Sequence, residues 1–192
     1  MVWFNGLSFR YLIGIVTCAG AAFIGLLLME PYRLKRLRVF LDPWAEYEGG
    51  GFQVIQSLLA YHGGGIFGVG LGESQQRLFF LPDAHTDFIL AIIGEEFGLV
   101  GTLTIVVMFS YLLFLGYRII QLQSDPYRRL LAFGLTALLS IQAMVNMSVT
   151  LGLIPTKGIG LPFVSNGASS LLCFLIAVAI LSRLSQPDTR SA

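Results

Sequence analysis

Long apolar stretches separated by short polar clusters run along this chain and predict a series of membrane-spanning helices. The first stretch, residues 11–29, holds nineteen residues without a charge. At a rise of ~1.5 Å per residue it is long enough to cross a hydrocarbon core of ~30 Å. Further spans are predicted from residue 86 or 87 to about residue 117, over 130–153 and over 165–182. The first of these three is long for a span, so we expect it to be tilted or to extend beyond the bilayer.

A weaker apolar stretch, residues 49–72, lies between the first span and the others. It carries Gln53, Gln56 and His62, and it is interrupted by Gly-Gly-Gly at 63–65 and by further glycines up to residue 72. We expect a helix over 52–61, followed by an irregular or re-entrant segment that reaches the other side of the membrane. Irregular backbone at membrane depth is tolerated only where protein or a wet cavity surrounds it. The chain then has about five spans.

Composition supports a membrane protein of the all-α class. Of the 192 residues, 55% are hydrophobic and 12% are charged, and the mean hydropathy is +0.76, whereas a soluble domain has about 25% charged residues. We predict one integral membrane domain over 1–192, a polytopic helical bundle with a polar cytoplasmic tail at 183–192. Cys18 and Cys173 lie in apolar runs and are expected to be small buried side chains without disulfide or metal spacing. No signal peptide and no nucleic-acid partner are expected.

Basic residues gather at three places, which predicts the orientation of the chain. The clusters lie at 32–38, at 118–129 and after the last span. The positive-inside rule assigns such clusters to the cytoplasmic side. With five spans, all three clusters share one side if the N-terminus is outside and the C-terminus is cytoplasmic. The loops that carry Asp87 and Lys157 then face outside together, as two functional outer loops.

Ionisable side chains are concentrated between residues 81 and 98, in a chain that is otherwise mostly apolar. They are Asp83, His85, Asp87, Glu95 and Glu96. Thr86 or Asp87 can cap the helix that follows. Glu95 and Glu96 come about two turns into that helix, at a depth where a carboxylate is costly to place without a function or a partner.

Two amides on the predicted fourth span, Gln142 and Asn146, are four residues apart. That spacing puts them on one face of a helix. A polar pair on one face of a membrane helix is typical of a hydrogen-bonded contact with a neighbouring helix, and we predict such a packing contact here.

Each ionisable group also has a structural interpretation. Asp87 can serve only as a helix cap, and Glu95 and Glu96 can simply pair with polar groups of neighbouring helices. His85 can hydrogen-bond within its loop rather than act as a general acid. Lys157 can extend its ammonium group to the membrane interface without binding anything.

Several motifs carry a resemblance to a known family. They are Phe-Gly-Val-Gly-Leu-Gly at 67–72, Leu-Pro-Asp-Ala-His-Thr-Asp-Phe-Ile at 81–89, Ile-Gly-Glu-Glu-Phe-Gly at 93–98, Leu-Ile-Pro-Thr-Lys-Gly at 153–158 and Leu-Pro-Phe-Val-Ser at 161–165. Together they resemble the C-terminal half of the SEDS family (shape, elongation, division, sporulation), which includes FtsW, RodA and SpoVE. Pro-Thr-Lys-Gly is similar to the division-type FtsW form. The chain departs from the usual pattern at Asp83, where the family has Glu, and in the segment 165–170.

The resemblance implies a peptidoglycan glycosyltransferase that polymerises lipid II at the outer face of the bacterial cytoplasmic membrane during septal synthesis. It assigns the catalytic carboxylate to Asp87, which as a general base would activate the acceptor hydroxyl. Lys157 and Arg77, on the predicted outer side, are candidates to stabilise the leaving lipid diphosphate. We add further candidates for substrate binding; these are His85, Glu95, Glu96 and Ser169. A divalent cation is left open as a cofactor, although no ligand cluster in the sequence supports one.

The implied partners are lipid II, the undecaprenyl-diphosphate-linked glycan, a class B penicillin-binding protein and other membrane proteins of the division machinery. Two other functions stay open. Glu95 and Glu96 are what a lipid II flippase would use along a transport path, and a non-catalytic division scaffold is a third class. A complete SEDS protein has about ten spans, so the five predicted here indicate a fragment, a truncated product or one half of a split protein.

Overall fold

The computed structural model describes residues 51–74 and 87–186, together with positions 13–15, 17, 18, 20, 25, 36, 38–45 and 47. Its labelled helices are α3 (Gly51–Gly64), α4 (Ile89–Leu122), α5 (Pro126–Thr150) and α6 (Ala168–Ser185). Within these described ranges there is no strand, so the all-α prediction is confirmed. Three of the helices, α4, α5 and α6, are long and apolar enough to cross a membrane.

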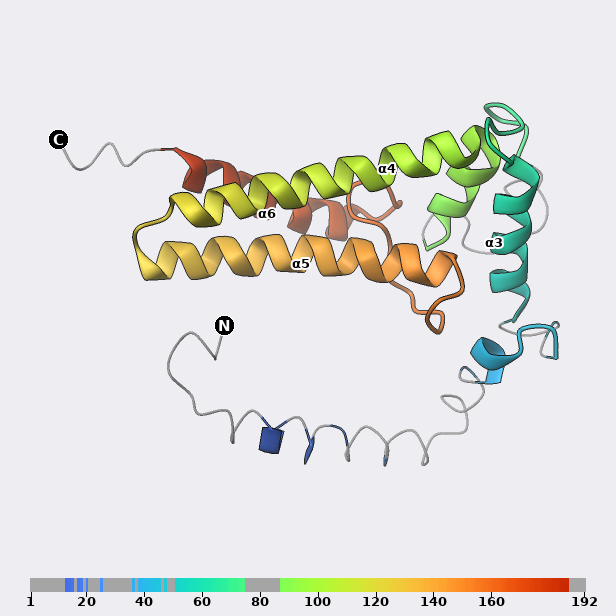
Figure 1. Cartoon of the computed structure of the whole chain (residues 1–192), viewed down its shortest axis with the longest axis horizontal. Helices are drawn as coiled ribbons and strands as arrows, with labels where there is room; N and C mark the ends of the chain where they lie inside the picture. Colours follow the sequence, from blue (N-terminus) through green and yellow to red (C-terminus); the bar gives the residue numbers. More distant parts are fainter. Residues whose placement is uncertain are drawn as a thin grey trace.

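The three long helices pack side by side as a bundle (Figure 1). Asp125 starts α5 sharply, because its carboxylate accepts from the backbone N–H groups of Tyr127 and Arg128 at 3.4 and 3.2 Å and Pro126 follows it at the first helical position. Apolar side chains of α5 and α6 form the largest core cluster, centred on Leu139 and Phe174. The amide of Gln123 donates to the carbonyl oxygen of Leu184 at 2.8 Å, so α6 ends beside the α4–α5 link.

Helix α3 lies across one end of this bundle rather than along it (Figure 1). It is tied to the end of α5 by two hydrogen bonds. The Ser57 hydroxyl donates to the Thr150 carbonyl oxygen at 2.7 Å, and the Tyr61 hydroxyl donates to the Thr150 hydroxyl at 3.0 Å. With 14 residues, α3 is about 20 Å long and too short to span. The helix predicted over 52–61 is confirmed, but the prediction that residues 49–72 cross to the other side is wrong, because α3 and the loop that follows it lie at one end of the bundle.

Helix α4 is interrupted at Gly98, whose φ of 65° and ψ of −157° are not helical. Its short first piece turns away from the long remainder beside α3 (Figure 1). The break leaves two carbonyl oxygens and two N–H groups without helical partners, and the glycine-rich loop of residues 65–74 binds all four. Val69 and Gly70 donate to the carbonyl oxygens of Glu95 and Glu96 at 3.0 and 3.1 Å, and Leu99 and Val100 donate to those of Gly65 and Ile66 at 2.9 and 3.3 Å.

Close backbone approach explains the glycines at this contact. A Cβ at Gly98 would lie 2.5 Å from the Gly68 nitrogen and from the Ile66 carbonyl, and one at Gly68 would overlap the Glu96 carbonyl. No side chain fits at either position. The loop therefore replaces a missing helical turn, and the predicted irregular glycine segment has a defined structural purpose: it satisfies buried backbone groups that the bilayer could not.

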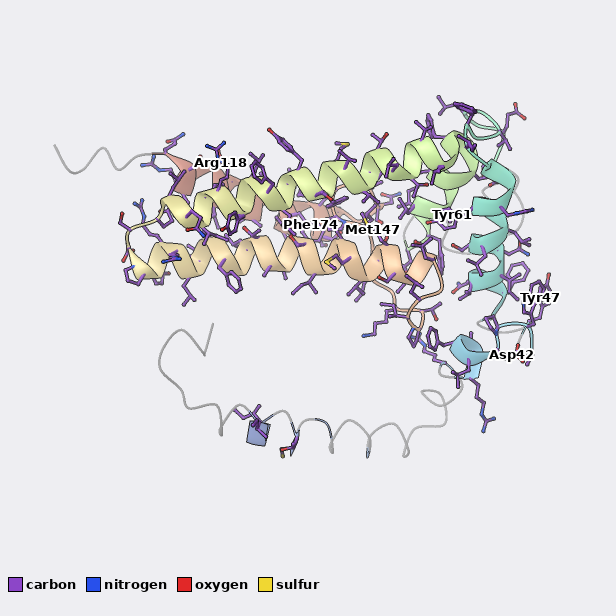
Figure 2. The ribbon with its side chains drawn as sticks, viewed as in Figure 1. Asp42, Tyr47, Tyr61, Arg118, Met147 and Phe174 are labelled. Atoms are coloured by element: carbon purple, nitrogen blue, oxygen red, sulfur yellow. The ribbon has the colours of Figure 1, made fainter. Side chains whose placement is uncertain are left out.

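Arg36 corrects the predicted side of the first basic cluster. Its guanidinium donates to the Thr156 carbonyl oxygen at 3.1 Å, so it lies at the end of the bundle that holds the 154–165 loop. Figure 2 shows Asp42 and Tyr61 at this end and Arg118 near the opposite one. The cluster at 32–38 was predicted to share a side with 118–129, and for Arg36 this is wrong. Because α3 is too short to span, the number of spans no longer supports an N-terminus on the outside.

Three further predictions concern the first span, the two cysteines and the C-terminal tail. The described positions within 11–29 are helical, and the rest of that first span lies outside the described residues. Cys18 and Cys173 are exposed and not buried, so this prediction is wrong. Helix α6 runs to Ser185, and residues 187–192 of the predicted polar tail at 183–192 lie outside the described residues.

Candidate functional site

Asp87 lies just before α4 and is half-buried. The residues that precede it, 75–86, lie outside the described part of the chain. The residue that starts the helix is Phe88, and no side chain caps it. The predicted cap at Asp87 is therefore wrong, and Thr86 lies outside the described residues. The Phe88 ring is 2% exposed and packs against Ile92 and Val149. This buried ring anchors the backbone beside the Asp87 carboxylate.

The 154–165 loop meets Asp87 from the other direction. A Cβ on Gly158 would lie 3.5 Å from the Asp87 Oδ2 atom, an ordinary contact distance, so this backbone lies directly against the carboxylate. Lys157, the preceding residue, is exposed. The structure thus brings the backbone at Gly158 against the Asp87 side chain, so the segments that carry Asp87 and Lys157 lie next to each other.

Two amides of α5 hold this loop in place. The Asn146 Nδ2 atom donates to the carbonyl oxygens of Asp87 and Ile159 at 2.9 and 2.8 Å, and the Gln142 Nε2 atom donates to that of Gly160 at 3.3 Å. The same-face prediction for Gln142 and Asn146 is right, but their partners are loop carbonyls and not another helix. Leu161 closes the loop: its side chain is 1% exposed, and its N–H donates to the Ser165 hydroxyl at 2.6 Å.

Glu95 and Glu96 are both buried, in the short piece of α4 before the break. Their carboxylates receive hydrogen bonds from the glycine-rich loop. The Gly72 N–H donates to Glu96 Oε1 at 3.2 Å, and the Ser74 hydroxyl donates to Glu95 Oε2. A buried carboxylate is retained only where such donors offset its lost hydration. These contacts hold residues 72–74, which lead into the segment that ends at Asp87.

The other predicted site residues are placed as follows. Ser169 is exposed in the first turn of α6, and the described hydrogen bonds do not connect it with Asp87 or Lys157. Arg77, Asp83 and His85 lie outside the described residues. Over the part of the chain that is described, no group of three or more His, Cys, Asp or Glu side chains could hold a metal ion, so a divalent cation stays a prediction.

Sequence reasoning missed two members of the site. They are Gly158, which the sequence marks only as part of an outer-loop motif, and Ser74. Their importance depends on contacts with Asp87 and Glu95, which no local pattern reveals. For Asn146 the sequence did contain a signal, because a buried amide on an apolar helix needs hydrogen-bond partners. The sequence pattern does not show which residues those partners are.

Comparison with known proteins decides the family. The model of the cell cycle protein family FtsW/RodA/SpoVE matches residues 1–190. The chain belongs to this family. This match confirms the resemblance to FtsW, RodA and SpoVE that the sequence motifs indicated.

Relatives and a solved structure agree with that assignment. The chain is 48% identical to the probable peptidoglycan glycosyltransferase FtsW of Geobacter metallireducens, over 96% of this chain and 49% of the relative. It is 47% identical to stage V sporulation protein E of Bacillus subtilis, over 91% of this chain and 47% of the relative. A chain of a peptidoglycan synthase complex that coordinates polymerization and crosslinking matches with a TM-score of 0.71 and 29% identity, over 97% of this chain and 53% of that one. The chain thus spans about half the length of the FtsW-family proteins it matches.

Proposed function

We propose that this chain carries the catalytic carboxylate of a peptidoglycan glycosyltransferase that polymerises lipid II. The observation that carries the proposal is the convergence at one end of the bundle of Asp87 and the Lys157 segment, with Gly158 lying against the carboxylate. The family membership and the names of the relatives support the same activity. Because the chain covers about half of those relatives, the remaining substrate contacts are proposed to come from the portion that they have in addition.

In the proposed reaction, Asp87 acts as general base. Its carboxylate takes the proton of the acceptor hydroxyl, whose oxygen forms the new glycosidic bond to the anomeric carbon of the donor. The bond between that carbon and the lipid diphosphate breaks, and the diphosphate leaves as an anion. Lys157, whose side chain is exposed and which directly precedes Gly158, is proposed to stabilise that growing negative charge. Arg77, His85 and Ser169 remain proposed substrate contacts.

The contacts of Glu95 and Glu96 favour an anchoring role over a transport path. Their carboxylates hydrogen-bond Ser74 and Gly72 of the glycine-rich loop. A flippase would need polar groups that line a route across the membrane, whereas the Glu96 carboxylate accepts from a backbone N–H and the Glu95 carboxylate from a hydroxyl of the glycine-rich loop. We therefore rank the polymerase above the flippase. We also rank it above a scaffold, because the segments that carry Asp87 and Lys157 lie against each other.

Partners and location follow from the same proposal. The structural neighbour belongs to a peptidoglycan synthase complex, which supports a class B penicillin-binding protein as partner. We propose that the end with Asp87 faces the outside of the bacterial cytoplasmic membrane and that the C-terminus is cytoplasmic. Lipid II, the growing glycan and other division proteins would meet the chain at the outer end.

Cysteine labelling tests this orientation. In a background without Cys18 and Cys173, we expect Gly158→Cys and Arg38→Cys to react with an impermeant thiol reagent in intact cells, and Ser124→Cys to react only after permeabilisation. All three positions are exposed, so accessibility to the reagent is matched. Labelling of Ser124→Cys from outside would invert the proposed orientation, and protection of Arg38→Cys would contradict the Arg36 contact.

The activity is tested with purified lipid II. The chain is co-expressed with the N-terminal half of an FtsW relative, purified, and incubated with lipid II, and glycan strands are resolved on a gel. Glycan is expected with the parent and not with Asp87→Ala. Glycan that persists with Asp87→Ala would reject the assignment of the base, and movement of lipid II across vesicles without any glycan would favour the flippase.

A further inference from the structure

One buried side chain joins the two segments of the site. Asn146 is 1% exposed, and both hydrogen bonds of its Nδ2 atom go to backbone carbonyls. One acceptor, in Asp87, is 59 residues away in the sequence, and the other, in Ile159, is 13 residues away. An amide nitrogen has two hydrogens to donate, so this nitrogen is fully used in bridging the two segments.

The bridge depends on the chemistry of an amide. Two carbonyl oxygens repel a carboxylate and gain nothing from an aliphatic side chain, so neither Asp nor Leu can replace the double donor. Among the described residues, the Asn146 Oδ1 atom has no hydrogen-bond partner, although a buried acceptor without a donor is costly. The two donated bonds therefore set the orientation of the side chain at the expense of its own oxygen.

The bridge reaches the reacting groups through short backbone paths. Asp87 is held at its own carbonyl, one residue before the buried Phe88. Ile159 is held one residue after Gly158, which lies against the Asp87 carboxylate, and two residues after Lys157. A shift of either segment along the Asn146 amide would change the separation between the carboxylate and the Lys157 backbone.

We propose that Asn146 is a positioning residue that holds the Asp87 carboxylate and the Lys157 segment at the separation needed for transfer. Its part in catalysis rests on the proposed polymerase function, whereas the two hydrogen bonds of the bridge do not depend on that function. Asn146 touches no reacting atom and acts only through the two backbones. Misplacement of a catalytic group by about 1 Å can cost ~10²-fold in rate, so a side chain of this kind affects turnover without binding substrate.

Disulfide trapping tests the bridge without using activity. Asp87→Cys and Gly158→Cys are introduced into the complete chain with Cys18 and Cys173 replaced, because the Gly158 Cβ position lies beside the Asp87 side chain. With Asn146 present we expect rapid disulfide formation under mild oxidation. With Asn146→Asp or Asn146→Ala, the loss of both buried hydrogen bonds should slow it by about tenfold. Ser140→Ala, which removes another hydrogen bond made by α5, is the matched control and should leave the rate unchanged.

Kinetics test the consequence for catalysis, with Asp87 and Gly158 intact. Asn146→Asp and Asn146→Ala should lower kcat for lipid II polymerisation by about 10–100-fold and leave KM within a factor of about two. Ser140→Ala should match the parent in both constants. A general loss of folded protein would reduce the active fraction, which is measured by size-exclusion chromatography and divided out.

The outcomes separate this inference from the function on which it rests. If the parent makes no glycan but trapping slows in the Asn146 variants, the bridge stands and the polymerase proposal fails. Unchanged trapping, or unchanged kcat in an active protein, would overturn the positioning role. Aggregation of both Asn146 variants would also overturn it, because the side chain would then be needed for folding and not for alignment.

Discussion

Asp87→Asn is expected to lower the rate of lipid II polymerisation by ~10²–10⁴-fold, the usual contribution of a positioned general base. The amide has nearly the shape of the carboxylate but cannot take up the acceptor proton. The start of α4 should survive the change, because Phe88 and not Asp87 is its N-cap and because Asn146 binds the Asp87 backbone rather than its side chain. The measurement is the initial rate of glycan formation per folded protein.

Controls separate loss of the base from loss of the structure. Asp42→Asn makes the same exchange in an exposed carboxylate that accepts from the Trp44 and Ala45 N–H groups at 3.1 Å each, bonds that an Asn oxygen can also accept. It should leave the rate unchanged. Asp87→Glu should keep some activity if placement has slack, and Asp83→Asn should do much less than Asp87→Asn. A greater loss with Asp83→Asn would mean that the wrong carboxylate has been assigned.

Gly98→Ala should strongly destabilise the protein. The φ and ψ of Gly98, 65° and −157°, lie in a region that is essentially restricted to glycine and costs another residue about 1–3 kcal/mol. The new Cβ would also meet the loop backbone at 2.5 Å, which adds an overpacking cost of about 1–3 kcal/mol. A total near 3 kcal/mol corresponds to a fall in Tm of roughly 6–12 °C for a domain of this size. Thermal unfolding followed by size-exclusion chromatography would measure it.

Gly63→Ala is the matched control for this prediction. Gly63 lies within α3, and a Cβ there would have no atom within 4 Å. Alanine favours a helix over glycine by about 1 kcal/mol, so the Tm should stay the same or rise. Equal Tm values for Gly98→Ala and the parent would mean that the loop does not dock on the break of α4 as described.

The sequence allowed much of the site to be predicted because some of its signals are local. Apolar run length identified α4, α5 and α6, and the residue motifs pointed to Asp87 and Lys157 before any contact was known. The expectation that their loops lie on the same side agrees with the Asn146 bridge, which joins the two segments at one end of the bundle. Two of the wrong predictions required a spatial relation. Residues 49–72 were counted as a crossing from their apolar character, and Arg36 was assigned a side from charge alone, although its partner is Thr156.

By itself, the sequence determined that the chain is a helical membrane protein of the FtsW/RodA/SpoVE family, with a carboxylate and a lysine in two loops expected on the same side. Apolar length, charge and motif are properties of neighbouring residues, so they are readable without a fold. Only the tertiary structure decided that the glycine-rich loop completes α4 at its break, that Glu95 and Glu96 anchor that loop, and that Asn146 joins Asp87 to Ile159. Buried polar groups must find partners, and here those partners come from segments far apart in the chain, which only the packed fold brings within hydrogen-bond distance.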